Sequence, residues 1–88
     1  MRLPVFDLHC DTALALSERA DVYTSLRSNQ RHIDLTRAGE LGGYAQCFAC
    51  FTTPFMEEWP HISPILAFER ELATIQREID KNSRRIAI

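Results

Sequence analysis

Two acids and a histidine at alternate positions near the N-terminus form the pattern most able to carry chemistry. Asp7, His9 and Asp11 fall at the end of an apolar run over residues 3–9 that we predict to be a β-strand. Because side chains alternate between the faces of a strand, all three point to the same side. Imidazole nitrogens and carboxylate oxygens are both zinc ligands. His9 and Asp11 are therefore candidate metal ligands, with Asp7 as a group that orients them.

A second histidine–aspartate pair has the same spacing but a different setting. His32 and Asp34 follow a polar loop, so we expect Asp34 to cap a short helical turn over residues 35–38 and His32 to be exposed or structural. His61 lies in a predicted connection and has no partner in the sequence. His9 and Asp11 also allow a structural interpretation, in which the two side chains only form hydrogen bonds and bind no metal.

The three cysteines suggest reduced thiols. An odd count, Cys10, Cys47 and Cys50, does not fit a disulfide framework. Cys47 and Cys50 have the two-residue gap of zinc ribbons and redox motifs, but positions i and i+3 of a strand face opposite sides. We expect these cysteines to be small buried apolar residues; a thiol-based redox or zinc-ribbon protein is the competing interpretation.

Strands and helices alternate along the chain around these residues. After the first strand we predict a helix over residues 13–20, and residues 44–52 are apolar on both faces, as in a buried parallel strand. Residues 84–88 resemble the beginning of a third strand. The order β-α-β-α-(β) predicts a parallel α/β fold, in which ligand sites form at the carboxyl ends of the strands.

The best-defined predicted helix begins at Ser63 and Pro64 and reaches about residue 82. Ser is a favoured cap and Pro a favoured first helical residue. Its apolar stripe consists of Ile65, Phe68, Leu72, Ile75 and Ile79. We expect this stripe to face the core and the charged residues beside it, Glu71 and Glu78 included, to be solvated.

Composition and charge exclude several classes of protein. The chain is 45% hydrophobic and 25% charged with a net charge of −2, so it lacks the basic surface that nucleic-acid binding requires. No stretch approaches the roughly 20 apolar residues of a membrane span, and the acid at position 7 interrupts any signal-peptide core. We therefore expect a cytoplasmic protein with neither nucleic-acid nor membrane partners.

Three blocks of the sequence together resemble a known enzyme family. Residues 7–12 (DLHCDT), 32–43 (HIDLTRAGELGG) and 45–51 (AQCFACF) are similar, in order and spacing, to the N-terminal third of the membrane (renal) dipeptidase family of the amidohydrolase superfamily. The resemblance implies a metal-dependent (β/α)₈ hydrolase that cleaves dipeptides at a two-zinc centre. It also implies that His9 and Asp11 are ligands of one zinc ion, while the other ligands have no counterpart in these residues.

The length limits what this chain does alone. A complete (β/α)₈ barrel needs about 250 residues, so we expect residues 1–88 to be a single partial domain, the N-terminal β-α-β-α segment of an incomplete TIM-like barrel. We expect such a segment to be inactive by itself. Its expected partners are a dipeptide in the complete enzyme, and a second copy of the chain or the rest of the enzyme. The alternative is a small non-catalytic α/β interaction module with a structural His9–Asp11 pair.

Overall fold

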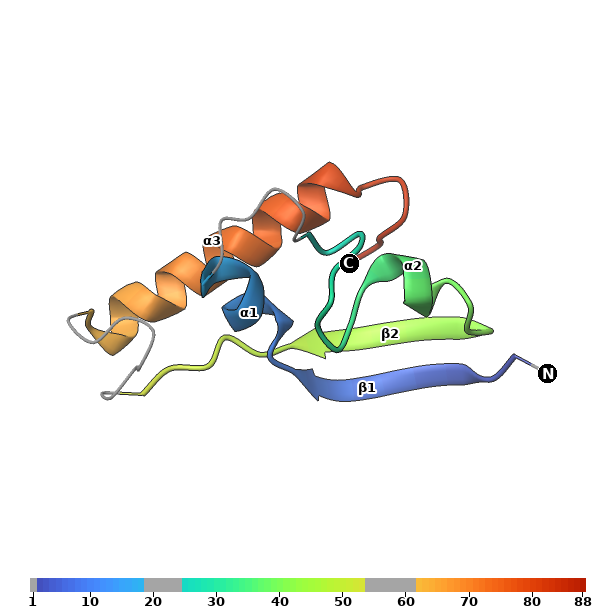
Figure 1. Ribbon diagram of the computed structural model, residues 1–88, viewed down its shortest axis with the longest axis horizontal. Coiled ribbons are helices and arrows are strands. Elements are labelled where there is room, and N and C mark those ends of the chain that lie inside the picture. Colours follow the sequence, from blue (N-terminus) through green and yellow to red (C-terminus); the bar gives the residue numbers. More distant parts are fainter. Residues whose placement is uncertain (1, 19–24, 54–61) are drawn as a thin grey trace.

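Two parallel strands joined by a helical crossover form the frame of the chain (Figure 1). The computed structural model describes residues 2–18, 25–53 and 62–88. Its elements, in chain order, are β1 (Pro4–Cys10), α1 (Thr12–Glu18), α2 (Leu35–Ala38), β2 (Gly43–Phe48) and α3 (Pro64–Lys81). In the view of Figure 1 the three helices lie to one side of the strands. The predicted parallel α/β arrangement is confirmed.

The pairing of β1 with β2 is regular over the first half of β1 and irregular over the second. Pro4 lies opposite Gly43 and Asp7 opposite Gln46, and the register then shifts before Cys10. The crossover enters β2 through Gly42, whose N–H donates to the Leu3 carbonyl at 3.0 Å. A Cβ atom at position 42 would lie 2.6 Å from the Arg2 carbonyl oxygen, so only glycine allows this approach.

α3 begins as its sequence predicts. The Ser63 hydroxyl accepts a hydrogen bond from the Leu66 N–H at 3.3 Å, and Pro64 is the first helical residue.

α1 packs against α3, and a small core forms from Ala13, Leu16, Leu26 and Ile75. Among the described residues, no helix is both long and apolar enough to cross a membrane.

The buried face of α3 differs from the predicted stripe. Ile65 is 73% exposed and Phe68 is 45% exposed, whereas Glu71 and Glu78 are buried. At about 1.5 Å per residue, the 18 residues of α3 span roughly 27 Å and the 7 residues of α1 roughly 10 Å. α1 therefore covers only part of α3. The expectation that Glu71 and Glu78 are solvated is wrong.

Glu78 is buried because it accepts a backbone hydrogen bond from the crossover. Its Oε1 atom receives the N–H of Leu26, which is fully buried, at 2.7 Å. Lys81, one turn further along α3, lies 3.3 Å from the other carboxylate oxygen. This carboxylate satisfies a buried donor 52 residues away in sequence, which an apolar side chain could not do.

One face of the two-stranded sheet is open, and no third strand forms among the described residues. Phe6 is 65% exposed and Leu8 is 73% exposed, and Ala45 and Cys47, which share this face, are exposed as well. β2 is therefore not buried on both faces. Residues 84–88 are not a strand, because the Asn82 carbonyl accepts the N–H groups at positions 85 and 86 and turns the chain.

The contact between Glu78 and Leu26 yields a stability prediction. Replacing Glu78 with Ala leaves the buried Leu26 N–H without its acceptor, so we expect the free energy of unfolding to fall by about 1–3 kcal/mol. Glu78→Gln keeps an acceptor oxygen and should lose less. Urea denaturation followed by circular dichroism measures both. Glu69→Ala, at an exposed position of the same helix, is the control, and an equal loss in Glu69→Ala and Glu78→Ala would contradict the assignment.

Candidate metal site and the adjacent pocket

His9 and Asp11 lie together where β1 ends and α1 begins. His9 is the penultimate residue of β1, in the stretch where the register with β2 shifts. Asp11 follows the strand directly, and its carbonyl accepts the Ala15 N–H at 3.1 Å. The His9 Nε2 and Asp11 Oδ1 atoms are 3.2 Å apart, and the two side chains are 64% and 54% exposed. The structure thus places the two predicted ligands side by side on an accessible edge.

The contact between these two atoms is a hydrogen bond or ion pair, and its length is also compatible with two ligands of one metal ion. Zinc takes nitrogen and oxygen ligands at about 2.0–2.2 Å in tetrahedral geometry, so two such ligands lie roughly 3.4 Å apart. The observed 3.2 Å is close to this value. Within the described part of the chain, however, no third His, Cys, Asp or Glu joins them in a group that could hold a metal. Two such side chains alone do not complete the ligand set of a zinc ion.

Asp7 is held by the neighbouring strand. Its Oδ2 atom accepts a hydrogen bond from Gln46 Nε2 at 2.8 Å, and the Tyr44 hydroxyl donates to Gln46 Oε1. Burial raises the pKa of Tyr44, and the nearby Cys10 and Asp7 raise it further, which keeps this phenol protonated as a donor. Asp7 thus ties β1 to β2, and the hydrogen bond of its carboxylate goes to Gln46 rather than to His9 or Asp11.

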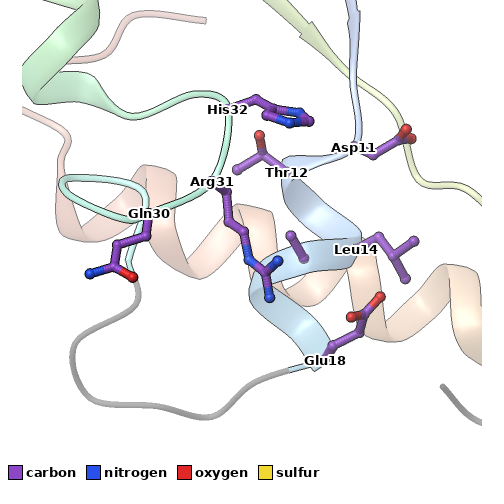
Figure 2. A pocket seen from close by; sticks show the side chains of 8 residues that line it. Asp11, Thr12, Leu14, Glu18, Gln30, Arg31 and His32 are labelled. Carbon is purple, nitrogen blue, oxygen red and sulfur yellow. The ribbon is translucent and has the colours of Figure 1, made fainter.

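A pocket of about 300 Å³ opens between α1 and the polar loop, with Asp11 as the member of the pair that lines it. Figure 2 shows the loop side chains Arg31 and His32 extending toward α1, with the His32 ring facing Thr12. Asp11 also lines this pocket, although its carboxylate points away from the loop. The sequence analysis did not identify Arg31, because nothing in the local pattern distinguishes it from the other loop arginines.

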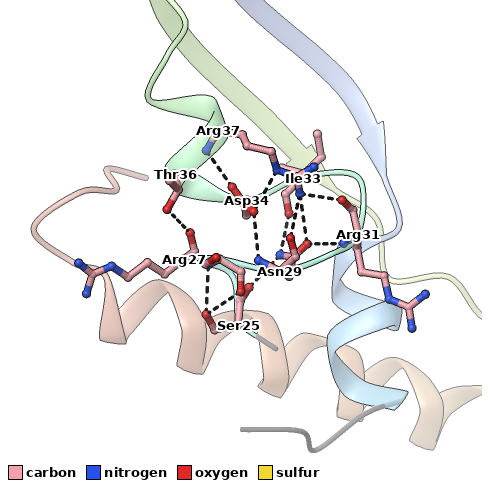
Figure 3. A network of polar contacts seen from close by, with 9 residues as sticks. Ser25, Arg27, Asn29, Arg31, Ile33, Asp34, Thr36 and Arg37 are labelled. Atoms are coloured by element: carbon pink, nitrogen blue, oxygen red, sulfur yellow. Dashed lines mark hydrogen bonds and ion pairs between the residues drawn. The ribbon is translucent and has the colours of Figure 1, made fainter. Parts of the chain in front are cut away.

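A buried carboxylate organises the loop that carries Arg31 and His32 (Figure 3). Asp34 caps α2, as predicted, by accepting the Arg37 N–H at 2.8 Å, and it also accepts the Asn29 N–H at 3.0 Å. The Arg37 guanidinium lies 3.0 Å from the same carboxylate. Burial alone would raise the pKa of Asp34, but the two backbone N–H groups and the guanidinium outweigh it and lower that pKa.

The cysteines do not form a common site. All three are free, with Cys10 buried, Cys47 exposed on the open face of β2 and Cys50 half-buried against the core. The prediction of buried apolar cysteines is thus wrong for Cys47. Burial, with the Glu71 carboxylate nearby, raises the pKa of Cys50, so this thiol stays protonated at neutral pH. His61 lies outside the described residues.

Comparisons with known proteins identify no relative of this chain. No family model, curated protein or solved structure matches it.

The Asp34 network predicts a pH-dependent contribution to stability. Because its pKa is lower in the folded state than the ordinary value of 3.8, Asp34 stabilises the fold above about pH 4, and this contribution is lost as the pH falls through the folded-state pKa. We expect Asp34→Ala to lower the free energy of unfolding by about 1–2 kcal/mol at pH 7 and by less near pH 3. Urea denaturation at both pH values tests this, with the exposed Asp80→Ala as control. A loss that is independent of pH would contradict it.

Proposed function

We propose that this chain is the N-terminal β-α-β-α segment of a zinc-dependent, dipeptidase-like metallohydrolase, and that His9 and Asp11 are ligands of one zinc ion. The observation that carries the proposal is the position of this pair. His9 and Asp11 lie at the carboxyl end of a strand in a parallel pair, where ligand sites of α/β barrels form. Their 3.2 Å separation suits a shared metal ion.

Zinc bound there would polarise a scissile amide carbonyl and lower the pKa of a bound water. The residues of this chain supply the frame for that chemistry. His9 Nε2 and Asp11 Oδ1 are the ligand atoms, and the bond from Gln46 to Asp7 holds β1 against β2 just before them. Because two ligands do not make a catalytic zinc site, hydrolysis of a dipeptide requires further ligands from the complete enzyme.

The open sheet supports the proposal of a barrel segment. Within the described residues β1 and β2 pair only with each other, so each has a free edge. The apolar side chains of Phe6 and Leu8 stand exposed on one face. In a (β/α)₈ barrel, neighbouring strands occupy such edges and helices cover such faces. Association with the rest of the enzyme would supply both.

A second proposal is a non-catalytic α/β interaction module. The exposure of Phe6 and Leu8 favours it, because large exposed apolar patches mark contact surfaces. In that case the hydrogen bond between His9 and Asp11 only stabilises the start of α1. Metal binding separates the two proposals, since the module does not require it.

Zinc titration tests the metal site directly. We expect the wild-type chain at pH 7.5 to bind one zinc ion by isothermal titration calorimetry, and His9→Ala and Asp11→Ala each to weaken this binding at least tenfold, because each removes one ligand. His32→Ala is the matched control, since His32 also precedes an aspartate by two residues. Equal zinc affinity in wild type and His9→Ala would contradict the proposal, as would an equal loss in His32→Ala.

A further inference from the structure

β1 carries exposed apolar side chains on both of its faces. Phe6 and Leu8 stand on the open face of the sheet, as described above. On the other face Val5 is 38% exposed, and Leu3, just before the strand, is 62% exposed. An exposed hydrophobic strand at the edge of a sheet is a template for pairing with a strand of another chain.

The two edges of the sheet differ in what lies beside them. Residues of α2 and residues 85–88 line a groove along β2, so the chain itself flanks that strand. β1 lies at the margin of the molecule in Figure 1, with β2 and the helices on its other side. Among residues 2–18, 25–53 and 62–88, no segment pairs with the outer edge of β1. β1 is therefore the edge that is open to another chain.

The backbone groups of Phe6 point to this open edge. The Leu3 carbonyl accepts the Gly42 N–H, so Leu3 faces β2. Since successive residues of a strand direct their backbone groups to opposite edges, Val5 also faces β2, whereas Pro4 and Phe6 face outward. Pro4 has no N–H to donate, as is typical of an edge strand. Phe6 thus offers both a donor and an acceptor to a neighbouring strand.

The charges at the two ends of β1 favour antiparallel pairing of two copies. Arg2 precedes the strand and Asp11 follows it, and both are exposed. Antiparallel pairing brings Arg2 of each copy near Asp11 of the other, whereas parallel pairing brings like charges together. Asp7 does not oppose the pairing, because its carboxylate accepts a hydrogen bond from Gln46 of β2 at 2.8 Å.

We propose that a second copy of this chain pairs with the open edge of β1 in antiparallel orientation, with the two Phe6 residues directly opposite each other. In this register they exchange both backbone hydrogen bonds across a two-fold axis. Phe6 and Leu8 of both copies form one apolar cluster on the open face. Moving the axis one residue toward the carboxyl end would oppose the two Asp7 residues, where like charges repel. This dimer needs neither metal nor substrate, so it goes beyond the proposed function.

Sedimentation velocity tests the dimer at pH 7.5, with EDTA and a reducing agent to prevent bridging by metal ions or by the exposed Cys47. The contact is one strand wide and interfaces this small are weak, so we expect a dissociation constant on the order of 100 µM. Phe6→Lys and Leu8→Lys put a charge into the apolar cluster and should each weaken the dimer at least about tenfold. Ile65→Lys is the matched control, since Ile65 is 73% exposed, as Leu8 is, but lies on α3.

An isotope-filtered NMR experiment on a mixture of labelled and unlabelled chains tests the register. With the two Phe6 residues opposite each other, Val5 of one copy faces Asp7 of the other in a non-hydrogen-bonded pair. The Hα protons of such a pair are close, so we expect an intermolecular NOE between them.

Three results would overturn this dimer. The first is a chain that stays monomeric up to about 1 mM, which would leave the edge of β1 to a different chain such as the rest of the enzyme. The second is a dimer that Phe6→Lys leaves unchanged or that Ile65→Lys weakens equally. The third is a dimer without the NOE between Val5 and Asp7. Circular dichroism shows whether each variant keeps its helices, and zinc binding does not enter these measurements, so their failure leaves the metal site untouched.

Discussion

The parallel pairing of β1 and β2 is the constraint on which the rest of the structure depends. Parallel neighbours cannot be joined by a tight turn, so the chain must cross from the end of β1 back to the start of β2. That crossover, residues 11–42, contains α1, the polar loop and α2. It begins at Asp11 and ends at Gly42, beside the start of β1, and on the way its loop residues Arg31 and His32 line a pocket with Asp11 and the first turns of α1.

Because the apolar core is small, buried carboxylates do much of the work of holding this crossover in place. Asp34 binds two backbone N–H groups of the loop, and Glu78 on α3 receives the Leu26 N–H. Loops carry many backbone donors that cannot be buried without partners. By satisfying them, Asp34 and Glu78 allow an irregular segment to pack against a helix. The same bonds fix the backbone of the pocket, so stability and the candidate site depend on one network.

Local signals in the sequence predicted the elements well. Ser63 and Pro64 begin α3, and Asp34 caps α2, because capping involves atoms only two or three residues apart. The contact between His9 and Asp11 also joins residues only two positions apart, as the sequence pattern predicted. Burial was harder to predict. The hydrophobic stripe of α3 indicated Ile65 and Phe68 as core residues, but α1 is too short to cover them.

The sequence by itself determined the order of the elements, their caps and the adjacency of His9 and Asp11, since each depends on neighbouring residues. Only the tertiary structure decided that Glu78 is buried, that residues 84–88 turn away rather than pair, and that Arg31 reaches the pocket beside Asp11. These features depend on contacts between segments far apart in the chain. A hydrogen bond such as that between Leu26 and Glu78, 52 residues apart, leaves no periodic signal in either segment.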